Sequence, residues 1–244
     1  MKAYKTNLIL IFLLLGISPW AFSASAEMSS KHLRLVKDLM NNNLAYSQDA
    51  TTTNIIEWEE EIVDSLRQKK DYRNMFLMKQ MAVYAYSLQA KISEALKKAD
   101  AMMDEARLMK YNIGISLSYQ ALGDIYLNAG MRPEAVEEYE KAMKTLQATP
   151  HAEKIQERIF IQLVPTLIKL KRMDEAKAYL EHMSEICESK CLSPFLLYAY
   201  HAYYYLRNND LSKAREYIDE AIKINSRTPS HFYDNILKLS LIHI

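Results

Sequence analysis

Alanine recurs at a nearly constant distance along the chain, and this spacing limits what the sequence can fold into. Ala95, Ala135, Ala176 and Ala214 are separated by steps of 40, 41 and 38 residues. Each is followed four and seven positions later by an apolar, aromatic or second small residue, which is the spacing of one helix face. Small residues are needed where two helices approach closely, and a period of this length is typical of repeated helix pairs. The spacing therefore predicts an all-α chain of repeated helix-turn-helix units.

The rest of the chain has the same helical period. No sustained alternation of apolar and polar residues indicates a strand. Short breaks containing Gly, Pro or Asn, such as 130–133 and 208–210, separate short helices. Pro133 is placed at a first helical turn, where its missing N–H is tolerated. Pro165 instead lies inside a helical pattern, where we expect it to kink the helix or to remove a hydrogen bond.

Composition excludes several kinds of site. The chain of 244 residues has four glycines, and no two of them have the spacing of a phosphate-binding loop. The chain has 31 Lys and Arg and 30 Asp and Glu. This near-neutral balance argues against a basic surface that binds nucleic acid. The six histidines are scattered without a metal-ligand spacing, and no Ser lies in a Gly-flanked elbow. We therefore expect no catalysis, cofactor or metal within these residues.

The N-terminus has the pattern of a secretory signal. Two lysines precede an apolar run at 8–17, and small residues at 24–26 form a cleavage site before Glu27. An uncleaved membrane anchor is the alternative, but a spanning helix needs about 20 apolar residues and this run is shorter. We interpret residues 1–26 as a signal peptide and expect the mature protein in the periplasm.

A longer pattern surrounds Ala135 and resembles a known repeat. Its members are Tyr119, Leu122, Gly123, Tyr126, Ala135, Tyr139 and Ala142. This stretch resembles the tetratricopeptide repeat, whose first helix carries a large residue, Leu-Gly and Tyr and whose second carries Ala, an aromatic residue and Ala. A later stretch matches except that His201 replaces the usual Leu; it contains Tyr198, Ala202, Tyr205, Ala214 and Ala221. Two further units, around Ala95 and Ala176, are degenerate.

The resemblance implies an α-solenoid, a right-handed superhelix of stacked helix pairs. We expect a degenerate helical pair in 27–75, four repeats in 76–228 and the start of another repeat in 229–238. The last six residues, 239–244, resemble the translated end of a transposon used in sequencing libraries. We interpret them as a non-native tail and the chain as a fragment of a longer protein.

In tetratricopeptide repeats the first helices line a concave groove, which by resemblance binds a peptide or a partner protein. The amides and Arg of this groove are then expected to hold the main chain or a carboxylate of the partner. The alternative is an ordinary solvated face on a scaffold whose partner binds elsewhere. The positions that correspond to the groove are Gln80, Tyr84, Ser87, Gln120, Asp124, Asn128, Arg158, Ile161, Lys169, Tyr203, Leu206 and Arg207.

Aromatic residues crowd the first helix of the last complete unit. Tyr198 and Tyr205 are expected to pack into the repeat core, leaving Tyr200 and Tyr203 to line surfaces. His201 is interpreted as a packing residue.

The two cysteines, Cys187 and Cys191, lie four positions apart near the end of a predicted helix. Export would place them where disulfides persist. A regular helix orients such a pair poorly, so a bridge requires some unwinding. A local disulfide and two buried thiols both remain open, and a metal site lacks further ligands in the sequence.

The layout, a signal peptide followed by helical repeats, resembles the periplasmic sensor regions of membrane-bound histidine kinases and helix-turn-helix regulators. The membrane would then be reached only through a spanning helix beyond the fragment. The sequence is also compatible with a stand-alone scaffold of envelope assembly. In each case we expect a protein or peptide partner and no nucleic acid.

Overall fold

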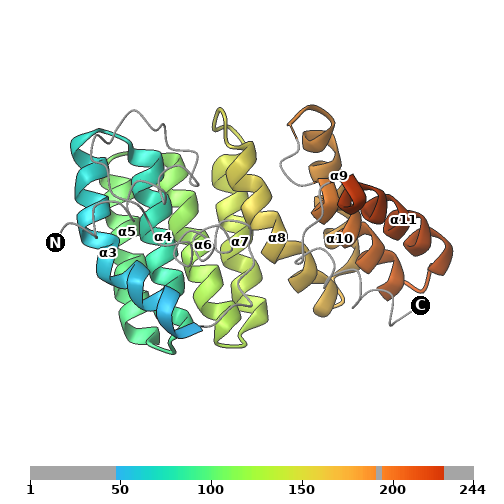
Figure 1. The fold of residues 1–244 in the computed structure, drawn as a ribbon, viewed down its shortest axis with the longest axis horizontal. Helices are drawn as coiled ribbons and strands as arrows, with labels where there is room; N and C mark the ends of the chain where they lie inside the picture. The colour runs from blue at the N-terminus through green and yellow to red at the C-terminus, as the bar shows by residue number, and fades with distance from the viewer. Residues whose placement is uncertain (1–47, 191–193, 228–244) are drawn as a thin grey trace. The chain divides into compact units, whose positions relative to one another are not determined.

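The computed structural model describes residues 48–190 and 194–227, and every regular element in these residues is an α-helix (Figure 1). The helices are α3 (Gln48–Gln68), α4 (Tyr72–Leu88), α5 (Ile92–Leu108), α6 (Asn112–Asn128), α7 (Arg132–Leu146), α8 (Glu153–Lys169), α9 (Met173–Lys190), α10 (Pro194–Arg207) and α11 (Leu211–Arg227). The predicted signal peptide, the further repeat at 229–238, the tail at 239–244 and Cys191 lie outside the described residues.

The chain forms two compact units, one ending at Asn128 and the other beginning at Ala129. In the first, α4 packs against α3, α5 and α6, and α5 packs against α6. In the second, α8 packs against α7 and α9, and α10 packs against α8, α9 and α11. Packing of consecutive helices confirms the predicted fold class, an all-α solenoid of helix pairs.

The recurrent alanines lie where the period predicted close helix packing. Ala95, Ala135, Ala176 and Ala214 are each 0% exposed. In the first unit, Ala95 belongs to a core cluster with Val83 of α4 and Ala121 of α6. A longer side chain at Ala95 would push these helices apart, so the small residue is a requirement of the packing.

Most turns between helices place a residue other than glycine in the left-handed region. At the end of α5, Lys110 has φ 52°, and its N–H donates to Arg107 O while Tyr111 N–H donates to Ala106 O. This pair of bonds is the Schellman pattern, which satisfies the last carbonyls of the helix. Gly130 is the glycine with such a φ. The other residues with positive φ are Lys70, Ala90, His151, Lys171 and Asn209.

Replacing Lys110 with Gly is expected to raise the free energy of unfolding by about 0.5–1 kcal/mol. A non-glycine residue costs about 1–2 kcal/mol in this conformation, and the entropy of glycine in the unfolded chain offsets part of the gain. Urea unfolding measures the change. Arg107→Gly, in the last helical turn, is the matched control and should lose about 1 kcal/mol. A loss in both variants would contradict the explanation.

Ion pairs join the helices of the first unit. The Glu105 carboxylate of α5 accepts from Arg67 Nη2 of α3 at 2.9 Å and from Lys79 Nζ of α4. Burial raises the pKa of Glu105, but the bonds from Lys79 and Arg67 outweigh it and hold the pKa below its usual value. A second ion pair joins α3 and α5, between Lys98 and Glu59, which is 7% exposed.

Pro165 lies inside α8, as its sequence position predicted, and its missing N–H would leave the carbonyl of Ile161 without the usual donor. The Tyr200 hydroxyl of α10 donates to this carbonyl at 3.1 Å. Burial raises the pKa of Tyr200, so the hydroxyl keeps its proton and remains a donor. Tyr200, which was expected to line a surface, is half-buried: it packs against the core of α10 and α11, and its hydroxyl reaches the interrupted helix.

Candidate functional site

Helices α4 and α6 of the first unit bring together the polar groove positions predicted for them. We call this set the α4/α6 polar face; its members are Gln80, Tyr84, Ser87, Gln120, Asp124 and Asn128. Two hydrogen bonds cross between the helices. Gln80 Nε2 donates to Asp124 Oδ2 at 2.7 Å, and Asn128 Nδ2 donates to Ser87 Oγ at 2.8 Å. The Ser87 hydroxyl in turn donates to Tyr84 O at 2.8 Å. The face is therefore a network of hydrogen-bonded side chains on two neighbouring helices.

The α4/α6 polar face is more buried than a solvated groove would be. Gln80 and Asp124 are each 3% exposed and Gln120 is 4% exposed, whereas Asn128 is exposed. Within the described part of the chain, Gln120 Oε1 has no hydrogen-bond partner. A buried acceptor without a donor costs about 1–3 kcal/mol. Gln120 thus marks a point where a donor from outside the described residues would be favourable.

Tyr84 is placed beside the acidic member of the face. Its pKa is raised, first by burial and then by the negative charge of Asp124. The phenol stays protonated at neutral pH and can donate a hydrogen bond. The face combines carboxylate, amide and hydroxyl groups, and two of its amides already donate, Gln80 to Asp124 and Asn128 to Ser87. It carries no basic side chain of its own.

The groove positions of the second unit are spread along α8 and α10. Arg158 and Tyr203 are half-buried, whereas Lys169 and Arg207 are exposed at the last residues of their helices. Arg158 and Lys169 are separated by about 16 Å along α8 at 1.5 Å per residue. Ile161 and Leu206 are half-buried beside them. One small ligand cannot reach both basic residues of α8, but an extended segment can.

The residues that carry the repeat pattern have the burial expected of packing positions. Gly123, Ala135, Tyr139 and Ala142 are buried on α6 and α7. Three larger residues of α6 are half-buried: Tyr119, Leu122 and Tyr126. On α10 and α11, Ala202 and Ala221 are buried and Tyr205 is half-buried. Tyr205 was predicted to pack into the core of the repeat, and it lies at the edge of that core.

Comparison with protein families identifies the repeat to which two of these helix pairs belong. The model of the tetratricopeptide repeat matches residues 117–145 and 197–228, which correspond to α6 with α7 and to α10 with α11. The chain contains tetratricopeptide repeats. The two matches coincide with the units whose sequences fit the tetratricopeptide pattern best, and the units described as degenerate are not matched. No curated protein gave a significant match to the chain.

His201 replaces the usual Leu of the tetratricopeptide pattern and is held by packing and by a hydrogen bond. Its ring stacks on Tyr217 of α11, with centroids 4.5 Å apart and planes inclined by 9°. Its Nε2 lies 3.1 Å from Ser184 Oγ, whose hydroxyl donates to Leu180 O. When the hydroxyl donates to Leu180 O, the matching tautomer of His201 carries its proton on Nε2 and donates to Ser184 Oγ. Burial lowers the pKa of His201 to about 4, although the charge of Glu181 opposes this, so the ring is neutral. Its interpretation as a packing residue is confirmed.

The cysteine pair is the remaining candidate site from the sequence. Cys187 is disulfide-bonded, while the predicted partner, Cys191, lies outside the described residues. Within 48–190 and 194–227, no group of His, Cys, Asp or Glu has the arrangement of a metal site. None of the helices described is both long and apolar enough to cross a membrane.

Proposed function

We propose that the chain is an exported module that binds an extended peptide or a segment of a partner protein along the first helices of its repeats. Tetratricopeptide repeats are protein-protein interaction modules, which sets the class of function. The N-terminal pattern supports export to the periplasm. The layout favours the sensing region of a longer signalling protein, such as a histidine kinase or a helix-turn-helix regulator. A stand-alone scaffold of envelope assembly is the second candidate.

The buried Gln120 oxygen, which has no hydrogen-bond partner among the described residues, carries the proposal. An extended peptide presents main-chain N–H groups, which are the donors that this buried oxygen lacks. Asp124 lies one turn further along α6, and exposed Asn128 follows one turn later. Because Gln120 is 4% exposed, a partner that reaches it must displace neighbouring side chains. Binding is therefore expected to involve rearrangement of the α4/α6 polar face.

Gln120→Leu tests the proposal because it separates binding from stability. The protein is expressed with its native N-terminus and recovered from the periplasm, where its first residue is expected to be Glu27. Peptides selected from a random display library on this protein are then titrated. Leu removes the unpaired acceptor, so the variant should be more stable by about 1 kcal/mol and should bind the selected peptides about tenfold more weakly.

Gln68→Leu, at the exposed end of α3, is the matched control and should change neither quantity appreciably. Equal weakening in both variants, or unchanged peptide binding by Gln120→Leu, would contradict the proposed site. Retention of Met1 in a cytoplasmic protein would contradict export.

A further inference from the structure

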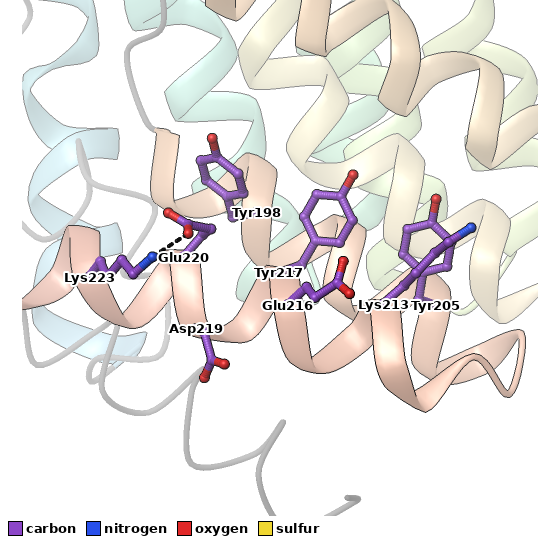
Figure 2. A pocket seen from close by; sticks show the side chains of 8 residues that line it. All are labelled: Tyr198, Tyr205, Lys213, Glu216, Tyr217, Asp219, Glu220 and Lys223. Atoms are coloured by element: carbon purple, nitrogen blue, oxygen red, sulfur yellow. Dashed lines mark hydrogen bonds and ion pairs between the residues drawn. The ribbon is translucent and has the colours of Figure 1, made fainter.

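Helices α10 and α11 enclose a second feature, a hollow of about 540 Å³ lined by three tyrosines (Figure 2). We call it the tyrosine hollow, defined by Tyr198 and Tyr205 of α10 and Tyr217 of α11. It does not include Tyr203, Leu206 or Arg207, the groove positions of α10. The hollow is therefore a surface distinct from the one that carries the proposed function.

The aromatic wall of the hollow is preorganised. The Tyr205 and Tyr217 rings are stacked, with centroids 5.4 Å apart and planes inclined by 14°. The Tyr198 ring lies 6.1 Å from Tyr217. Behind Tyr217, the neutral ring of His201 stacks at 4.5 Å and is fixed by Ser184. These contacts leave little rotamer entropy to be lost when a ligand binds.

The charges around the wall are not balanced locally. Lys223 pairs with Glu220 at 2.5 Å, and Lys213 pairs with Asp210 at 3.7 Å. Both basic residues of the hollow are thus engaged. Glu216 lies beside the Tyr217 ring (Figure 2), and no ion pair to it is found within the part of the chain that the structure describes. The charge left available beside the rings is a carboxylate.

The chain itself shows which group these rings accept. Lys213 Nζ lies over the Tyr205 ring, 5.1 Å from its centroid. An ammonium or guanidinium over a tyrosine face is attracted by the negative face of the ring. Arginine adds a planar guanidinium that stacks on tyrosine and can donate two hydrogen bonds to one carboxylate. Glu216 provides such a carboxylate in the hollow.

We propose that the tyrosine hollow binds an arginine side chain from a basic segment of a partner protein, stacked on Tyr217 and paired with Glu216. The stacked wall provides the aromatic face, and the carboxylate provides the charge complement. Tyr and Arg are also the residues that most often dominate protein interfaces. The proposal goes beyond the α4/α6 polar face, since it needs neither Gln120 nor Asp124.

The test uses the full chain and two fluorescein-labelled Gly-Ser peptides, one carrying paired arginines and one carrying glutamines at the same positions. Fluorescence anisotropy is expected to show binding of the arginine peptide that weakens with salt. Glu216→Gln should weaken it about tenfold. Asp219→Asn is the matched control, because Asp219 also lines the hollow and the change removes the same charge, but its side chain points away from the rings (Figure 2).

Tyr217→Phe keeps the ring and should retain binding, whereas Tyr217→Ala should abolish it, with circular dichroism verifying that both fold. Gln120→Leu should leave arginine binding unchanged, so failure of one site is distinguishable from failure of the other. Equal affinity for the glutamine peptide, or equal losses in Glu216→Gln and Asp219→Asn, would overturn the proposal. Self-association that Tyr217→Ala removes, without peptide binding, would assign the hollow to a second copy of the chain.

Discussion

Tyr200→Phe is expected to lower the free energy of unfolding by about 1–3 kcal/mol although it removes a single oxygen atom. The ring would keep its edge-to-face contact with Phe160, whose centroid lies 5.6 Å away. The carbonyl of Ile161 would lose the donor that replaces the N–H missing at Pro165. Such a loss leaves a buried polar group without a partner, which costs more than an average hydrogen bond contributes.

The size of this effect should depend on residue 165. Pro165→Ala restores an N–H to the interior of α8 and is expected to raise stability by up to about 3 kcal/mol. In that background Tyr200→Phe should cost less than about 0.5 kcal/mol, because Ile161 O then has a donor within its own helix. Chemical unfolding of the four proteins measures the coupling between the two residues. An equal cost of Tyr200→Phe in both backgrounds would contradict the explanation.

Gly114→Leu is expected to cost about 3 kcal/mol or more, because neighbouring side chains leave no room for a side chain at this position of α6. Even a Cβ atom at Gly114 would lie 3.0 Å from Ala106 Cβ and 3.1 Å from two ring carbons of Phe76. Gly114→Ala gains helix propensity but meets both contacts, so a net loss of about 1 kcal/mol is expected. Thermal and urea unfolding measure both variants.

Two further variants separate crowding from backbone effects. Gly130→Ala has no atom within 4 Å of its new Cβ, so its loss of about 1 kcal/mol would come from the φ of 82° alone. Phe76→Leu should relieve part of the cost of Gly114→Ala, and it should not relieve that of Gly130→Ala. If Phe76→Leu were simply additive with Gly114→Ala, the proposed steric contact would be absent.

The fold could be predicted from the sequence because its determinants are local and recur. An alanine every 38 to 41 residues has one physical meaning, a close approach of paired helices, and these positions are fully buried. Gly130 was also predicted at a turn and has φ 82° there. Pro165 was predicted to disturb its helix, but its position on α8 says nothing about which residue replaces the lost bond.

The sequence predicted which positions belong to the candidate sites, but it did not predict which side chains contact one another. Gln80 and Asp124 were assigned to one face of the helical repeats, but their mutual hydrogen bond depends on the register between α4 and α6. The same holds for Gly114, whose neighbours come from α4 and α5. Tyr205 was expected inside the core, whereas it lines the tyrosine hollow with Tyr217.

By itself the sequence determined that the chain is helical over the residues the structure describes, that its helices pair, and which small residues lie between them. Period and residue size fix these features, and both are local properties of the chain. Only the tertiary structure decided which hydroxyl meets Ile161, which acceptor on α6 has no donor among the described residues, and how three tyrosines line one hollow. Each depends on distances between helices far apart in sequence, and a shift of one helical turn would change the partners without altering the apolar pattern.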